Sequence, residues 1–142
     1  MSVVVHGKHP SYGDFLSYGL EKTAAKKLDD WGQTVLPLVR DTLGEEWESA
    51  WLNAPDLRFW IGADVLGMPL FGVWRASHDK VRRLYPFLFG LKGWVTSPPV
   101  RTAHDSIPFE VIERHLAQLE GIDPKNSGVQ ALIKDFELPE MT

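Results

Sequence analysis

The sequence predicts an α+β fold: a single-domain α/β sandwich with a central, mainly antiparallel sheet flanked by helices. Three observations support this prediction. A chain of 142 residues has the length of one domain. Apolar residues recur at helical spacing before and after the middle of the chain. The middle itself contains three aromatic and aliphatic runs typical of strands, and helices on both sides of such a meander describe an α+β domain.

The N-terminal third is predicted to form a strand followed by a helix. The β-branched run over residues 2–7 ends in a glycine and favours a strand. Residues 20–43 show helical spacing, with Thr23 as the expected cap. Pro37 either kinks this helix or begins a second one. The face expected to be buried consists of Leu28, Trp31, Val35, Leu38 and Val39.

Six tryptophans are many for this length, and most are expected in the core. Trp47 and Trp51 are an exception, because they lie one turn apart on a short predicted helix over residues 44–55. Aromatic residues are enriched at interface centres. This helix is therefore a candidate partner-facing surface, and it carries the acids Glu45, Glu46 and Glu48.

The middle of the chain is predicted to form neighbouring antiparallel strands. Residues 56–65 and 68–77 are expected to pair around a turn at Leu66 and Gly67, and residues 86–94 form a third strand.

Two helices are predicted in the C-terminal part, residues 108–137, which completes a single domain over residues 1–142. A proline-rich connection, residues 96–108, leads into the first helix. Its apolar stripe consists of Val111, Ile112, His115, Leu116 and Leu119. The second helix, residues 126–136, has Val129, Leu132, Ile133 and Phe136 facing inward.

Composition excludes several classes of function. The net charge of −4 gives no general attraction to nucleic acid or to anionic membranes. The absence of cysteine excludes disulfides, zinc-thiolate sites and cysteine nucleophiles. No stretch is apolar enough for a membrane span or a signal peptide, so the expected location is the cytoplasm.

The stretch GKHPSYGDF, residues 7–15, has a Gly-Lys pair beside a predicted strand but is not a phosphate-binding loop. In the P-loop the Gly-Lys pair comes last and a Ser or Thr follows it. Here the pair comes first, Pro10 offers no amide hydrogen, and Asp14 would repel a phosphate.

Two kinds of catalytic site are weighed against a structural role. Ser77, His78 and Asp79 have the residue types of a hydrolase triad, but consecutive residues rarely reach the required geometry. The His-Asp pairs at 78–79 and 104–105 suggest a metal-dependent phosphohydrolase that uses Asp14, His78 and Asp79. The favoured interpretation is that Asp79 and Asp105 are turn or capping residues. No cofactor and no metal are expected.

One basic cluster stands out in the sequence. Arg75, Lys80, Arg82 and Arg83 lie within nine residues and accompany a single acid, Asp79. The cluster is a solvated loop, or it binds a phosphate or the acidic surface of a partner. A further alternative is a phosphate-, nucleotide- or phosphopeptide-sensing domain that uses Lys8, Arg82 and Arg83.

Four ordered segments resemble the TagF proteins associated with bacterial type VI secretion. They are GKHPSYGDF, DDWGQTVLP, WLNAPDLRFWIG and FGVWRASHDKVRRLYPF, and the resemblance covers about residues 5–90. One position departs from the family pattern, because Arg82 replaces a glycine and is less suited to a positive φ angle. The matching positions are Gly7, Lys8, Pro10, Gly13, Asp14, Phe15, Trp31, Ala54, Pro55, Arg58, Phe59, Gly72, Ser77, Asp79, Arg83, Tyr85 and Pro86.

The resemblance implies a non-enzymatic accessory protein of the type VI apparatus. In studied members this is a post-translational repressor of secretion, which acts with a forkhead-associated scaffold protein and a threonine phosphorylation pathway. The fold is similar to longin- or profilin-like sandwiches.

A structural hypothesis follows for residues 7–15. Gly13 is expected to permit a bend, and Asp14 to satisfy local amides or pair with Arg58 or Arg83. Phe15 is expected to anchor the loop in the core.

Overall fold

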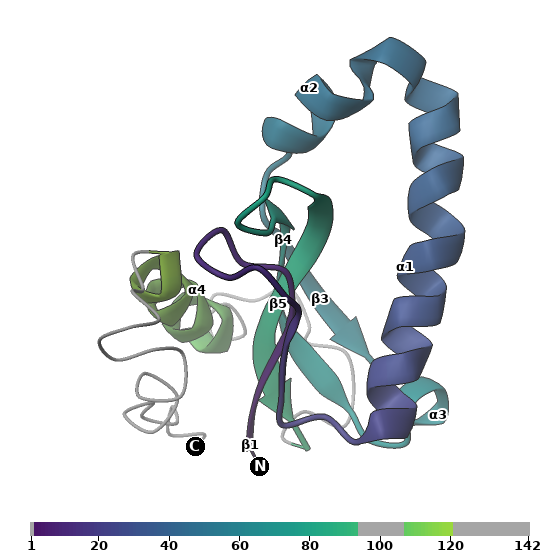
Figure 1. Cartoon of the computed structure of the whole chain (residues 1–142). Coiled ribbons are helices and arrows are strands. Elements are labelled where there is room, and N and C mark those ends of the chain that lie inside the picture. The colour runs from purple at the N-terminus through teal and green to yellow at the C-terminus, as the bar shows by residue number, and fades with distance from the viewer. Residues whose placement is uncertain (1, 94–106, 121–142) are drawn as a thin grey trace.

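A computed structural model describes residues 2–93 and 107–120. Its centre is a five-stranded antiparallel sheet with the order β2-β1-β5-β4-β3 (Figure 1). The strands are β1 (Ser2–Gly7), β2 (Leu16–Tyr18), β3 (Leu57–Ile61), β4 (Leu70–His78) and β5 (Leu84–Lys92). The described helices are α1 (Lys22–Leu43), the 3₁₀ turn η1 (Gly44–Glu46), α2 (Trp47–Leu52), α3 (Ala63–Leu66) and α4 (Ile107–Glu120).

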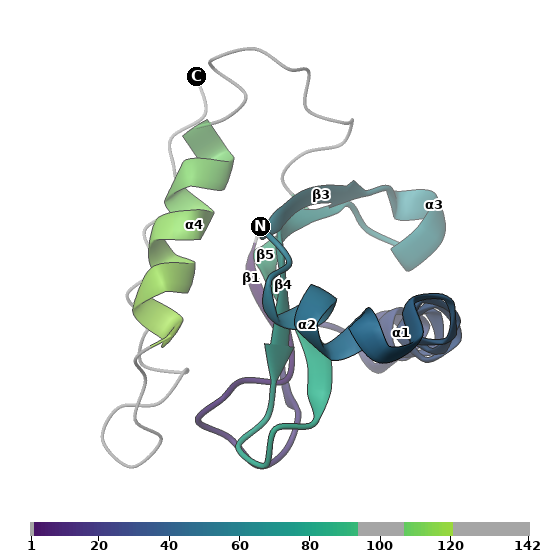
Figure 2. The same ribbon diagram turned by 90° about the horizontal axis from the view of Figure 1, so that it is seen from above.

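Helices cover both faces of the sheet, with α4 on one side and α1 on the other (Figure 2). Because side chains alternate across a strand, β1 sends Val3 and Val5 to the face of α4 and Val4 to the face of α1. On the α4 side these valines form a buried cluster with Phe71, Val73, Phe87, Phe89, Leu91, Ile112 and Leu116. The predicted α+β sandwich with an antiparallel sheet is confirmed.

The connection between β3 and β4 differs from the predicted tight turn. Strand β3 ends at Ile61, and the short helix α3 follows before β4 begins. Gly67 ends this helix with φ of 85°, a left-handed conformation that glycine adopts without a Cβ clash. The pairing of the two strands was predicted correctly, but a hairpin turn at Leu66 and Gly67 is wrong.

Helix α1 is one helix that continues through Pro37, so a second helix starting there is excluded. Its N-cap residue is Glu21 rather than Thr23. The predicted apolar face is only partly buried, because Trp31 is 55% and Leu38 is 63% exposed. The reason is geometric: the N-terminal half of α1 packs on the sheet, with Ala24 and Gly32 buried, and the C-terminal half stands away from it (Figures 1 and 2).

The tryptophans are less buried than predicted. Trp51 is buried, and its indole N–H donates to the carbonyl oxygen of Ser77 at 2.8 Å. Trp47, Trp60 and Trp74 are half-buried. Trp51 therefore fixes α2 against β4, and the prediction that it faces a partner is wrong.

Several predictions fall outside the described residues. They are Trp94, the connection to the C-terminal helix with its His104-Asp105 pair, the side chain of His115, and the second C-terminal helix. In the parts of the chain that the structure describes, no helix has the length and hydropathy needed to cross a membrane.

Candidate functional site

Two loops meet at one end of the sheet, and together they form the candidate site (Figure 1). The first loop, residues 8–15, joins β1 to β2, and the second loop, residues 79–83, joins β4 to β5. The backbone N–H of Lys8 donates to the carbonyl of Pro86 at 3.1 Å, and that of Lys80 donates to the carbonyl of Tyr12 at 2.7 Å. We call these two segments the loop pair.

The first loop is shaped by a β-turn around Pro10. The N–H of Tyr12 donates to the carbonyl of His9 at 3.0 Å, which places Pro10 at the second turn position, where its fixed φ is favourable. The Ser11 N–H donates to Nδ1 of the His9 ring at 3.1 Å. The chain bends at Gly13, but its φ is not positive and an added Cβ would meet nothing within 4 Å. The structure therefore does not need glycine for this bend, contrary to the prediction.

Asp79 organises the second loop with a carboxylate that is fully buried. Oδ1 accepts the backbone N–H groups of Val81 at 3.1 Å and Arg83 at 2.9 Å, and Oδ2 accepts Nε of Arg83 at 2.6 Å. Lys8 of the first loop places its Nζ 3.7 Å from Oδ2. The favoured prediction, that Asp79 is a turn residue, is confirmed.

The environment of Asp79 keeps its carboxylate ionised. Burial alone would raise the pKa of Asp79, but the hydrogen bonds from Arg83 and the charges of Arg83 and Lys8 lower it below its ordinary value. The carboxylate is therefore a fixed negative charge that holds two cations and both loops in place.

The ammonium group of Lys8 is enclosed by the site and does not project from it. Its Nζ lies 5.2 Å from the ring centroid of Phe15 and 5.7 Å from that of Tyr85, within cation–π range. Its side chain is only 12% exposed. Lys8 therefore links the two loops through Asp79.

Ser77, His78 and Asp79 do not form a catalytic relay. The Ser77 hydroxyl faces the carbonyl oxygen of His78 at 3.5 Å, and Nδ1 of His78 donates to the carbonyl oxygen of Asp79 at 2.7 Å. The side chains of Ser77 and His78 are thus each directed at a backbone carbonyl oxygen. Within residues 2–93 and 107–120 there is no group of three His, Cys, Asp or Glu side chains that could hold a metal ion.

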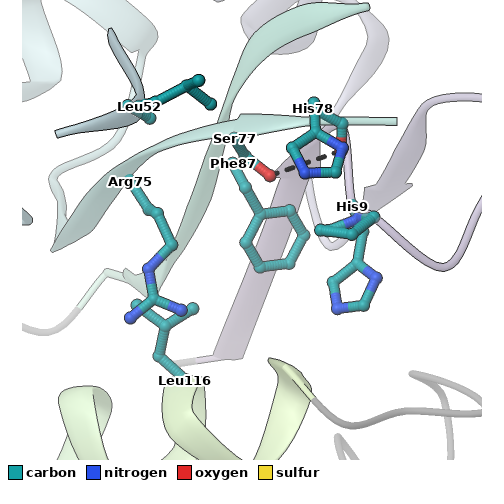
Figure 3. Close-up of a pocket in the computed structure, with 9 residues that line it drawn as sticks. His9, Leu52, Arg75, Ser77, His78, Phe87 and Leu116 are labelled. Carbon is teal, nitrogen blue, oxygen red and sulfur yellow. Dashed lines mark hydrogen bonds between the residues drawn. The ribbon is translucent and has the colours of Figure 1, made fainter. Parts of the chain in front are cut away.

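A pocket of about 310 Å³ lies between these residues and α4 (Figure 3). Buried His9, Ser77 and Leu116 and half-buried His78 line it. Arg75 also lines it, and its guanidinium binds both carboxylate oxygens of Asp56, at 3.0 and 2.7 Å. This cation of the predicted basic cluster therefore belongs to a surface ion pair.

Sequence reasoning missed a polar network beneath the first loop. Buried His6 contacts Asp29 of α1 through Nε2 at 2.8 Å and Ser17 of β2 through Nδ1 at 3.1 Å. The Tyr85 hydroxyl donates to the same oxygen of Asp29 at 2.9 Å. Burial, together with this hydrogen bond and the charge of Asp29, raises the pKa of Tyr85 above its ordinary value. We call these residues and the adjoining Gly32 the α1 latch.

Gly32 allows the close approach of α1 in this latch, because a Cβ added there would lie 3.0 Å from the Tyr85 hydroxyl. The contacts join residues 11 to 56 positions apart in the chain. No local pattern in the sequence signals such a network.

The order of these segments matches one known family. A family model described as the TagF N-terminal domain, type VI secretion system-associated, matches residues 4–124. The chain belongs to the TagF N-terminal domain family. It is similar to the crystal structure of PA0076 from Pseudomonas aeruginosa PAO1, with a TM-score of 0.79 and 28% sequence identity over 99% of this chain. The chain spans 64% of the length of that protein. A search of curated proteins gives no match.

Seven of the TagF signature positions lie in the loop pair, whereas Trp31, Arg58 and Phe59 lie on α1 and β3. Some of their contacts differ from those predicted. Arg83 binds Asp79 and also donates to the carbonyl of Gly13 at 3.0 Å, while Arg58 pairs with Glu113 of α4. Among the described residues, neither arginine is the ion-pair partner of Asp14. The predicted pairing is wrong because Asp79 lies buried and closer to Arg83 along the chain.

Phe15 of the TagF signature is not a core anchor, since it is 48% exposed. Its ring packs edge-to-face on Tyr85 with centroids 4.8 Å apart. Phe15 therefore covers the Lys8 side chain and the α1 latch from the solvent side.

Arg82 stands where the TagF pattern has glycine, and it adopts the left-handed conformation that suits glycine, with φ of 65°. Its N–H donates to the carbonyl of Asp79 at 3.0 Å. The turn is thus formed with an arginine, whose Cβ makes this conformation unfavourable by roughly 1–2 kcal/mol. The side chain is exposed at the tip of the loop.

Changing Arg82 to glycine is expected to stabilise this TagF domain. Relief of the left-handed strain outweighs the greater backbone entropy of glycine in the unfolded chain, for a net gain of about 0.5–1 kcal/mol. Urea unfolding measures this change, with Lys80→Gly as a control that removes a charge from an exposed neighbour. A fall in stability on Arg82→Gly would show that Arg82 makes a stabilising contact that offsets its strain.

Proposed function

We propose that this domain is a non-enzymatic, post-translational repressor of type VI secretion that acts in the cytoplasm by binding protein partners. The proposed partner is a forkhead-associated scaffold protein of the secretion system, within a threonine phosphorylation pathway. The family match supports the association with type VI secretion. The observation that carries the binding role is the construction of the loop pair.

The loop pair has two parts: a structural base, in which side chains bind one another, and an exposed cationic tip. The structural base consists of Asp79, Arg83 and Lys8, whose contacts hold the backbone of the second loop in place. Lys80 and Arg82 are exposed at the tip, and Val81 between them is 67% exposed. An ordered surface that combines cations with an apolar side chain suits an acidic protein partner, because little entropy is lost on binding.

The two alternative functions use groups that the structure assigns to the structural base. A metal-dependent phosphohydrolase would need the oxygens of Asp79, which already accept three N–H groups and lie beside two cations. A phosphate sensor would need Lys8 and Arg83, which both bind Asp79. Arg82, the third cation of that alternative, is exposed at the tip. The Arg83 side chain is 61% exposed, but it donates to Asp79 and to the carbonyl of Gly13. These contacts favour a protein-binding role.

The test compares a tip variant, Lys80→Glu with Arg82→Glu, with a control variant that changes two other exposed cations, Arg40→Glu with Arg114→Glu. Both variants have the same net charge. We expect the tip variant to bind the purified forkhead-associated scaffold at least about tenfold more weakly than the native domain, and the control to bind within about twofold. Isothermal titration calorimetry measures both affinities.

The second measurement is the level of type VI secretion in cells that overproduce the domain. Overproduction of the native domain in a type VI-competent bacterium is expected to suppress secretion, and the tip variant is expected not to. If the native domain neither binds the scaffold nor changes secretion, the proposed function is wrong. If binding persists in the tip variant, the loop pair is not the contact surface.

A further inference from the structure

An apolar groove of about 650 Å³ runs between α1 and the sheet. It follows α1 from Lys27 to Leu43, and Trp47 and Trp51 of α2 line its far end. At 1.5 Å per residue, this part of α1 is about 24 Å long. The groove shares no lining residue with the loop pair.

Large apolar side chains on both walls of the groove are open to solvent. On the α1 side these are Trp31 and Val39, and on the opposite side Leu57 and Val65. Trp31, Leu57 and Val65 are each more than half exposed. Soluble proteins rarely leave a contiguous apolar surface of this kind open unless it binds a partner.

Charged residues lie at both ends of the groove, and one end is clearly acidic. At the end near the start of α1, the exposed lysines Lys22, Lys26 and Lys27 are balanced by the exposed acids Glu21, Asp30 and Asp64, and Lys26 pairs with Asp30. The other end carries the exposed acids Asp41, Glu45, Glu46 and Glu48. Along the walls the charged lining groups are Lys27, which donates to the carbonyl of Val65, and Arg58, which pairs with Glu113.

We propose that the groove binds an amphipathic α-helix of a partner protein, about 16 residues long and basic at one end. The length follows from the groove, since a helix of 16 residues spans about 24 Å. The apolar walls require residues at i, i+3, i+4 and i+7 on one face of that helix. The basic end of the helix follows from complementarity with the exposed acids at one end of the groove. This site lies outside the loop pair, so it does not depend on the proposed scaffold contact.

A phage-displayed library of 16-residue helices, with random apolar-face and terminal positions, tests this proposal. The native domain is the target, and Val39→Glu is the counter-target because it places a charge in the groove. The matched control is Leu38→Glu, since Leu38 is the preceding residue, is more exposed and does not line the groove. Circular dichroism confirms that both variants are folded.

The expected result is enrichment of helices with one apolar stripe and a basic end. When these helices are made as synthetic peptides, their affinity for Leu38→Glu should equal their affinity for the native domain. Their affinity for Val39→Glu should be at least about tenfold weaker. The double variant Glu45→Lys/Glu46→Lys should bind the selected peptides at least about threefold more weakly than the native domain. A peptide with an acidic residue in place of its basic end should bind this double variant with restored affinity. If no helix is enriched over the Val39→Glu counter-target, or if those enriched lack a basic end, the proposal is wrong.

Two other occupants are excluded by separate measurements. If the groove binds a second copy of the chain, sedimentation velocity without any partner would show a dimer. This dimer would persist in Leu38→Glu and be lost in Val39→Glu. A fluorescent fatty acid that binds at one-to-one stoichiometry and displaces the selected helices would identify a lipid site. Either result would overturn the proposal of a partner helix, whereas failure of the tip variant to lose scaffold binding concerns the loop pair alone.

Discussion

Changing Asp79 to alanine is expected to lower the melting temperature by about 10 °C, the largest effect of any single change in the loop pair. The reason is that Asp79 is a fully buried acceptor for three N–H groups, two of them from the backbone of its own loop. Without it, these donors lose their partner, and Lys8 and Arg83 are left as adjacent cations. Differential scanning calorimetry measures this change.

Asp14→Ala provides the matched control, because this aspartate lies on the facing loop and is exposed. Its removal is expected to shift the melting temperature by less than about 2 °C, as is usual for surface substitutions. Asp79→Asn separates charge from shape: it keeps an acceptor for the backbone but presents an amide N–H₂ or a neutral oxygen to Arg83. A loss for Asp79→Asn as small as that for Asp14→Ala would contradict the role assigned to the charge.

The acid dependence of stability follows from the same carboxylate. Since the pKa of Asp79 is lower in the folded protein than in the unfolded chain, its ionised form stabilises the fold above the ordinary aspartate pKa of about 4. This contribution is lost as pH falls below that value through the folded pKa. Native protein should therefore lose more stability than Asp79→Asn between neutral pH and about pH 3, as measured by urea unfolding at each pH.

Much of the fold could be predicted from the sequence because the signals are local. The β-branched N-terminal run, the helical spacing after residue 20 and the aromatic strands each show their own periodicity, and the order of the three middle strands predicts their antiparallel pairing. Strand β2 and the pairing of β1 with β5 and with β2 were not predicted. What failed was the extent of burial along α1. Spacing identifies the apolar face of a helix, but it does not tell whether a sheet or a partner covers that face, and Trp31 and Leu38 remain largely exposed.

The candidate site was predictable in part for a related reason. Turn chemistry identified Asp79, since an aspartate that bonds the amides two to four residues ahead is a local event. The ion pairs were not predictable, because the choice of partner for an arginine depends on burial. Arg83 binds the buried Asp79 instead of the exposed Asp14, and Arg58 binds an acid 55 residues away.

Changing Asp29 to alanine is expected to destabilise the domain by about 2–3 kcal/mol, the second large effect we predict. One oxygen of Asp29 is bonded to buried His6 of β1 and to the hydroxyl of Tyr85 of β5. Alanine would leave both groups without this acceptor beneath α1. Asp30→Ala is the control, since this neighbour forms only an exposed i,i+4 pair with Lys26 and its removal should cost less than about a quarter as much. Urea unfolding measures both variants.

A double-mutant cycle shows whether the loss arises in the α1 latch itself. Tyr85→Phe removes the hydroxyl that donates to Asp29, so the losses for Asp29→Ala and Tyr85→Phe should overlap by about 1 kcal/mol in the double variant. Additive losses would mean that the two residues contribute to stability independently. Coupled losses would also concern the groove, because α1 forms one of its walls. The latch is one polar contact between the N-terminal half of α1 and the sheet, so weakening it should increase hydrogen exchange along α1 before the sheet itself opens.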